Sequence, residues 1–390
     1  MPVATPSSLA GIHSATIPQD RLLPGILGLR GIAAIAVVLF HLNHLAGLAV
    51  PQPFSFISSD FGYGVHLFFV LSAFSLMHST EHTMFRSTWA NEYLIKRFWR
   101  IAPLYYGIMA FIILRPAITS HPVTVDAQAL LLNLTFTFNF APWAGIVWGG
   151  WAVGVEMLFY VIFPVLLLTI RTTSTAFILV IVSLVISYVS RSTLQVHYES
   201  TMPQYDYNWA YFSFAPNLYF FAMGIYAYRL SHELSPALKA SRWLIPFFSV
   251  ACLGLLMLTG LDNPLKGAGR MDLMLWGCGF VALSIWQSNR PSFWSANRLL
   301  AYVGERSYSL YLLHPVIISL FLKQPLQNVY AELSPQLGEY AFFICAALLL
   351  VPLIALSEIT YRLIELPGIR VGQRINKRIR ANTRSHKNPH

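Results

Sequence analysis

The sequence predicts an all-α membrane protein, a polytopic helical bundle with about ten transmembrane helices. Of its 390 residues, 56% are hydrophobic and only 11% are charged. A soluble domain typically carries roughly 25% charged residues, so charge could not cover a water-exposed surface of this size. The mean hydropathy of +0.56 and the lack of low-complexity or strictly periodic sequence exclude a disordered, collagenous or coiled-coil chain.

The apolar residues form blocks of about 20 residues, the length that a helix needs to cross a bilayer. Ten such blocks predict spans at 27–48, 63–79, 101–118, 148–170, 175–190, 211–230, 243–261, 271–287, 303–322 and 340–361. Residues 127–140 are apolar but too few for a span, so we expect an interfacial or re-entrant helix there. The opening residues lack the basic and apolar segments of a cleaved signal peptide, and none is expected.

Lysines and arginines in the connecting segments predict the orientation, because cytoplasmic loops are rich in them. With both termini in the cytoplasm, the outer segments hold only Arg115, Arg191, Lys266, Arg270 and Lys323. The net charge of +10 is therefore a topology signal, and no nucleic-acid partner is expected. The expected organisation is a cytoplasmic segment 1–25, a transmembrane domain 26–365 and a basic cytoplasmic tail 366–390 at the anionic inner leaflet.

Polar side chains inside the spans point to function, because ionisable groups are costly in hydrocarbon. Arg30 and His41 lie eleven positions apart in the first span, which is roughly 16 Å along one helix face. Alone, Arg30 could snorkel to the interface and His41 could be a core histidine. Together they predict one wall of a substrate path, with a cation at its cytoplasmic mouth and an imidazole deeper in.

Glu156 is an isolated carboxylate in the fourth span, with no basic residue within seven positions. A carboxylate in hydrocarbon needs a partner from another helix, and His41 is the expected one. A carboxylate that orients an imidazole is a common arrangement for a general base. The alternative is a structural glutamate that joins two helices by hydrogen bonds.

Three further stretches permit both a functional and a structural interpretation. The run 96–100 (Lys-Arg-Phe-Trp-Arg) fits a phosphate-bearing ligand or the positive-inside rule. Tyr308, Tyr311 and His314 are spaced three apart on one helix face, which fits core packing or catalysis. We expect residues 191–210 to form a polar outer loop whose Tyr and Trp rings lie at the interface or stack on a sugar.

Six motifs follow one another along nearly the whole chain. They are Arg30 with His41, the phenylalanine-rich 64–74 that contains Ser72, the arginine-rich 97–106, 151–164 from Trp151 through Glu156, 307–314, and 361–367. In this order they resemble the motifs of the acyltransferase-3 family of bacterial integral-membrane O-acetyltransferases. The chain departs from the family pattern at His66, Ala73, Ala152 and Met157.

The resemblance implies an enzyme that moves an acyl group, most often acetyl, from cytoplasmic acyl-CoA to a hydroxyl of a cell-surface or lipid-linked glycan. It implies His41 and Glu156 as catalytic residues, with His41 a general base or the carrier of an acyl intermediate. Arg30, Arg97 and Arg100 are the expected acyl-CoA-binding residues. The candidate pore or acceptor contacts are Trp151, Ser72, Tyr308, Tyr311 and His314.

The same resemblance implies a multi-pass protein of the bacterial inner membrane. Some family members carry a fused extracellular hydrolase-like domain, and none is expected here, because the sequence stops soon after the tenth predicted span. No metal and no permanently bound cofactor are expected. The alternative function is a proton-coupled transporter or glycan flippase, which would also use intramembrane His and Glu residues. Such proteins often contain two pseudo-symmetric halves, and the sequence contains no matching halves.

Overall fold

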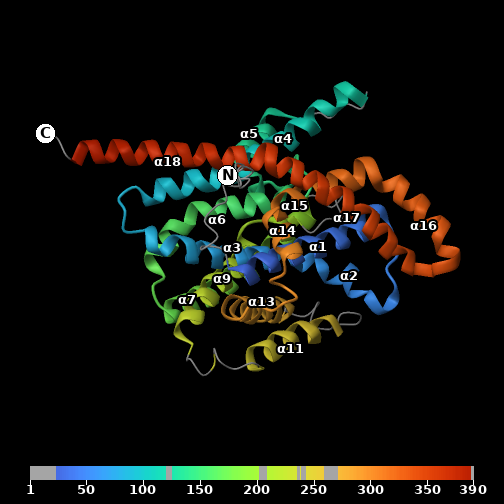
Figure 1. Cartoon of the computed structure of the whole chain (residues 1–390), viewed down its shortest axis with the longest axis horizontal. Coiled ribbons are helices and arrows are strands. Elements are labelled where there is room, and N and C mark those ends of the chain that lie inside the picture. The colour runs from blue at the N-terminus through green and yellow to red at the C-terminus, as the bar shows by residue number, and fades with distance from the viewer. Residues whose placement is uncertain are drawn as a thin grey trace, which may run out of the picture.

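The computed structural model describes residues 23–119, 125–201, 209–234, 238, 243–258 and 271–387, and all regular secondary structure in these ranges is helical (Figure 1). The principal helices are α1 (Pro24–Ala46), α3 (Gly64–Thr80), α4 (Trp89–Thr119), α6 (Gly150–Thr169), α7 (Thr173–Thr201), α9 (Leu218–Glu233), α11 (Leu244–Leu258), α13 (Met271–Asn289), α14 (Arg298–Glu305), α15 (Ser307–Ile317), α16 (Lys323–Leu337), α17 (Ala341–Thr360) and α18 (Leu366–Lys387). The predicted all-α fold is thus confirmed.

Each of the ten predicted spans overlaps a helix of the described chain. Six helical segments of that part are long and apolar enough to cross a membrane, so the chain is a multi-pass membrane protein. The number of ten spans stays a prediction. The predicted cytoplasmic segment 1–25 lies almost entirely outside the described residues, which begin at Leu23.

Helix α1 is held at the centre of the bundle by backbone contact with the segment before α15. Pro24 begins the helix, where the missing N–H of a proline leaves no intrahelical bond unmade. A Cβ at Gly28 would lie 1.7 Å from the Ser295 carbonyl oxygen, and one at Gly31 would lie 2.6 Å from that of Leu300. Only glycine permits such an approach, and this close contact fixes the depth and rotation of Arg30, which lies between the two glycines.

Helix α7 is longer than the sequence predicts, because it continues to Thr201 instead of ending near residue 190. Residues 191–201 of the expected outer loop are therefore helical, while 202–208 lie outside the described residues. The hydroxyls of Ser192 and Thr193 donate to carbonyls one turn earlier, at 3.0 and 2.9 Å. These bonds satisfy the polar side chains within the helix, so the loss of apolar residues does not end it.

The short apolar stretch at 127–140 does not form a span. It contains α5 (Ala127–Leu134), which has eight residues and is about 12 Å long. The Asp126 side chain caps this helix by accepting from the Ala129 amide at 2.6 Å. The expected short helix is confirmed, and its length is far below the bilayer thickness.

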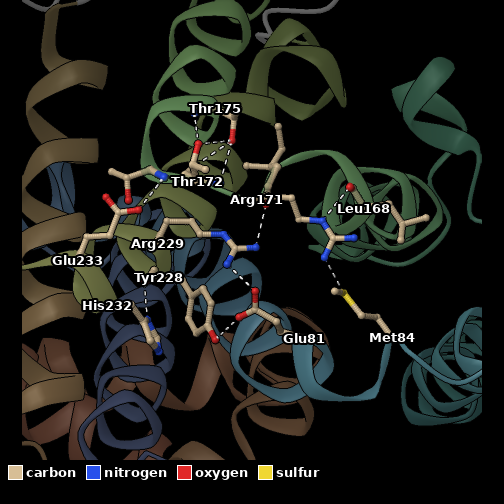
Figure 2. A network of polar contacts seen from close by, with 12 residues as sticks. Glu81, Met84, Leu168, Arg171, Thr172, Thr175, Tyr228, Arg229, His232 and Glu233 are labelled. Carbon is tan, nitrogen blue, oxygen red and sulfur yellow. Dashed lines mark hydrogen bonds and ion pairs between the residues drawn. The ribbon is translucent and has the colours of Figure 1, made fainter.

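An ion-pair network joins the ends of α3, α6, α7 and α9, as Figure 2 shows. Glu81, which follows α3, accepts from the Arg229 guanidinium at 2.5 Å and from the Tyr228 hydroxyl at 2.7 Å. Arg229 also donates to the Ile170 carbonyl at 2.8 Å. Charge-assisted bonds of this kind are among the stronger hydrogen bonds in proteins, so the network fixes α6 relative to α3.

Candidate active site

The two helices held by this network supply the partners of Glu156. Its Oε1 accepts from the Ser72 hydroxyl of α3 and from the Tyr160 hydroxyl one turn along α6, each at 2.5 Å. Glu156 also lines a small cavity of about 40 Å³, together with Arg30, Phe68, Tyr308 and Tyr311. The carboxylate is thus held by hydroxyl groups beside a cavity in the bundle.

His41 has different partners from those that the sequence suggests. Its Nδ1 lies 2.9 Å from the Val37 carbonyl oxygen and 3.0 Å from Nε2 of His314. The expected hydrogen bond between His41 and Glu156 is absent from the described structure, so that pairing is wrong. The physical reason is that nearer groups satisfy both side chains: two hydroxyls for Glu156, and a carbonyl and a second imidazole for His41.

Helix α15 brings three predicted residues to this region. The Tyr308 hydroxyl donates to the Ile101 carbonyl of α4 and the Tyr311 hydroxyl to the Gly149 carbonyl, each at 2.8 Å. His314 is fully buried, and its ring lies 5.6 Å from that of Tyr311. The two tyrosines therefore fasten α15 to α4 and to the start of α6, and His314 is held next to His41.

The three predicted arginines surround the same interior. The Arg30 guanidinium lies 5.4 Å from the Phe68 ring centre, and that of Arg97 lies 5.7 Å from the rings of both Tyr93 and Tyr160. Arg100 is within electrostatic range of Arg30. No carboxylate of the described chain forms an ion pair with any of these arginines. Glu156 is within electrostatic range of Arg30, and Glu365 is within range of Arg30 and Arg100, so these carboxylates offset part of the positive charge.

Trp151 is one of the predicted residues that do not line the cavity beside Glu156. Its ring instead packs on the rings of Phe69, Tyr211 and Phe212, at centroid distances of 5.1 to 6.1 Å. The side chain therefore contributes to an aromatic cluster between α3 and the segment before α9. Its position fits packing between helices.

Sequence reasoning did not assign a role to Glu365, although this carboxylate is only 1% exposed. It ends a π-helical turn, Tyr361–Glu365, and accepts a hydrogen bond from Ser309, to which Thr360 also donates at 3.0 Å. The sequence does contain an indication of its burial, since the two residues on each side of Glu365 are apolar. The π-helical turn that rotates it into the bundle leaves no mark in the sequence pattern.

A larger cavity, which the sequence does not indicate, opens near the ends of α4 and α15. It has a volume of about 440 Å³ and combines apolar side chains with Arg115, Asp126, Gln128, Trp143 and Trp148. One wall is Val316, two positions after His314. Within the described residues, no cluster of three or more His, Cys, Asp or Glu side chains is arranged to hold a metal ion.

Comparison with known proteins agrees with the motifs. A family model described as an acyltransferase domain matches residues 23–356. The chain belongs to the acyltransferase-3 family. The matched range contains Arg30, His41 and Glu156. No solved structure matches the chain.

Individual relatives are distant. A Staphylococcus aureus (strain COL) protein, provisionally named an O-acetyltransferase, is 24% identical over 89% of this chain and 57% of its own length. The peptidoglycan O-acetyltransferase OatA of Listeria monocytogenes is 28% identical over 38% of the chain and 24% of its own length. A Bacillus subtilis protein, provisionally named a peptidoglycan O-acetyltransferase, is 26% identical over 90% and 55%. The chain therefore spans little more than half the length of the relatives that it matches along most of its sequence.

Proposed function

We propose that the chain is a membrane acyltransferase that moves an acyl group, first of all acetyl, from acyl-CoA to a hydroxyl group of a carbohydrate. One observation carries this proposal. Arg30 lines a cavity beside Glu156, and a hydrogen-bonded histidine pair lies further along α1 and α15. Arg97 and Arg100 lie near the same interior, and none of the three arginines forms an ion pair with a carboxylate of the described chain. Family membership supports it, as do relatives whose names specify peptidoglycan O-acetylation.

The donor would enter at the arginine end of the site. Arg97 and Arg100 lie at the end of α4 that we assign to the cytoplasm, where acyl-CoA is found. Their guanidinium groups match phosphate oxygens in geometry and charge. The pantetheine arm would then pass Arg30 along α1 toward His41, which brings the thioester to the imidazole.

The chemistry follows from the state of His41. With its proton on Nδ1, facing the Val37 carbonyl, Nε2 carries a free lone pair and acts as a general base. Nε2 takes the proton of the acceptor hydroxyl while the oxygen attacks the thioester carbonyl. The C–S bond breaks, and the CoA thiolate leaves and takes up the proton. The route through acyl-His41, in which Nε2 itself attacks, uses the same groups.

The acceptor would enter from the opposite end of the bundle. The cavity of about 440 Å³ is large enough for a sugar ring, and its two tryptophans offer apolar faces while Asp126 and Gln128 offer hydrogen bonds. Val316 connects this cavity to the turn that carries His314. In this arrangement the protein lies in the bacterial inner membrane with both termini in the cytoplasm.

Thiol release from acetyl-CoA tests the proposal. Membranes that contain the native protein, supplied with glycan extract from the host, are compared with His41→Ala and with His44→Ala. His44 is the matched control, because it lies one turn further along α1 but is exposed, with its ring near the Ser58 carbonyl and the Phe40 ring. We expect extract-dependent release that falls at least a hundredfold in His41→Ala and stays within about twofold in His44→Ala.

Equal release by native protein and His41→Ala would overturn the assigned mechanism. Transport of a glycan or proton that continues without any acyl donor would instead favour the transporter or flippase. If thiol release fell as much in His44→Ala as in His41→Ala, the proposal would also be contradicted. The loss would then reflect a general disturbance of this end of α1 and not a specific role of His41.

A further inference from the structure

The C-terminal helix α18 is docked on α4 by a stripe of residues spaced four apart. A Cβ at Gly368 would lie 2.5 Å from the Trp99 carbonyl oxygen, and one at Gly372 would lie 3.1 Å from the Trp99 Cβ. One and two turns later, Asn376 Nδ2 donates to the Glu92 carbonyl at 2.9 Å and Arg380 forms an ion pair with the Glu92 carboxylate. Figure 1 shows α18, in red, crossing the bundle beside the start of α4. Most of the segment predicted as a basic tail is therefore a helix that is packed against α4.

This docking encloses a cavity of about 390 Å³ between the end of α3, the start of α4 and α18. Its lining includes five cations: Arg86, Lys96, Arg97, Lys377 and Arg380. Among the described lining residues the only carboxylate is Glu92, and Arg380 already pairs with it. The cavity thus carries a strong excess of positive charge, and Trp89 and Tyr93 provide aromatic surface.

Three buried polar atoms in this lining have no hydrogen-bond partner among the described residues. They are the Tyr93 hydroxyl, Oδ1 of Asn376 and Nε of Arg97. Tyr93 and Asn376 are only 4% and 2% exposed. Buried polar atoms in folded proteins are nearly always hydrogen-bonded, so these three atoms lack partners beside the cavity, although none of them is exposed to it in this structure.

We propose that this cavity binds the phosphorylated nucleotide end of the donor, the adenosine 3′,5′-bisphosphate portion of acyl-CoA, with α18 as one wall of the site. This inference rests on the proposed function. The volume is within the range of small-molecule sites and far exceeds what one phosphate group occupies. The cations fit the phosphates, and the aromatic surface of Trp89 and Tyr93 fits the face of the adenine ring.

The position of Arg97 connects this cavity to the candidate active site. Arg97 lines the cavity, and its guanidinium lies 5.7 Å from the ring of Tyr160, whose hydroxyl donates to Glu156. A nucleotide bound against α18 would thus have its phosphates at the entrance to the interior that holds Arg30 and Glu156. The rest of the donor would extend inward from there.

Binding and kinetics of charge variants test the inference. The double variant Arg86→Gln with Lys377→Gln removes two exposed cations of the cavity. The control, Arg374→Gln with Arg378→Gln, removes two exposed cations of α18 that lie outside it. With purified protein in phosphatidylcholine nanodiscs, we expect the Kd for adenosine 3′,5′-bisphosphate and the KM for acetyl-CoA to rise about tenfold in the first variant. Both should stay within about twofold in the control.

The outcomes separate this inference from the proposed function. Unchanged Kd and KM in the cavity variant, with His41-dependent thiol release intact, would overturn this inference alone. Nucleotide binding that depends on the cavity, without any thiol release, would support the site and overturn the proposed function. If the cavity variant lost only a dependence on phosphatidylglycerol added to the nanodiscs, the phosphate would be that of a lipid, and the inference would be wrong.

Discussion

The Nδ1 atom of His41 has two neighbours, a carbonyl oxygen of its own helix and Nε2 of His314. The carbonyl keeps the proton on Nδ1, while His314 limits the rotation of the ring. Because His314 is fully buried and α15 is fastened by its two tyrosines, the second imidazole is a rigid support. We interpret His314 as a positioning residue for the proposed base.

A pair of substitutions at His314 tests this role. His314→Leu removes the contact, and we expect kcat to fall about a hundredfold, comparable with the lower range for general-base catalysis, with little change in KM for acetyl-CoA. His314→Gln places an amide near the position of Nε2, and it should recover about tenfold of the lost kcat. Steady-state kinetics with both variants provide the measurement. Equal losses in the two variants, or a rise in KM alone, would indicate a role in packing.

For single residues, the sequence predicts well which side chains belong to the candidate site. It predicts their hydrogen-bond partners less well. Arg30, Glu156, Ser72, Tyr308 and Tyr311 all lie in or beside one interior. The prediction that Glu156 is the partner of His41 is wrong, because the relative depth of two spans depends on packing contacts such as that of Gly28 with Ser295. A shift of one helical turn, about 5 Å, exchanges one partner for another.

The helices owe their relative positions to a few glycines, and Gly28 on α1 shows this most clearly. Gly28→Ala would place a methyl group 1.7 Å from the Ser295 carbonyl oxygen, so α1 would have to move away from its neighbour. We expect the free energy of unfolding to fall by about 1–3 kcal/mol or more. Thermal unfolding of the detergent-solubilised protein would show this as a lower Tm.

Gly107→Ala on α4 is the matched control, because among the described residues no heavy atom beyond its own helical backbone and chain neighbours lies within 4 Å of the Cβ position there. Alanine favours a helix over glycine by roughly 0.5–1 kcal/mol, so the Tm should stay the same or rise. Equal Tm values for the two variants would contradict the close contact between α1 and Ser295.

Element types were predictable because each block of apolar residues is long and bounded by polar sequence. Element ends were less predictable. Helix α7 continues through 191–201 because its hydroxyl groups bond to its own backbone, a local effect that hydropathy does not register. The docking of α18 is not predictable from hydropathy, since the spacing of Gly368 and Gly372 indicates a contact only once α4 is known to lie beside it.

The whole molecule is predicted to hold its basic cavity in the cytoplasm and its tryptophan-lined cavity outside. Single cysteines in a background that lacks Cys252, Cys278 and Cys345, which are all free thiols, can test this. Ser87→Cys should react with a membrane-impermeant maleimide only after the cells are permeabilised, whereas Gln128→Cys and Asn328→Cys should react in intact spheroplasts. All three positions are exposed. The reverse pattern would mean that the protein has the opposite orientation.

The contact between α18 and α4 also has a consequence for biosynthesis. Asn376 and Glu92 are hydrogen-bonded although 284 positions separate them in the chain. The predicted spans are therefore all made before α18 can dock, and the basic cavity is open on one side until then. A nascent chain that has inserted its earlier helices would lack the wall against which a nucleotide could rest. The protein would thus become able to bind the donor late in biosynthesis, after the membrane-embedded part has assembled.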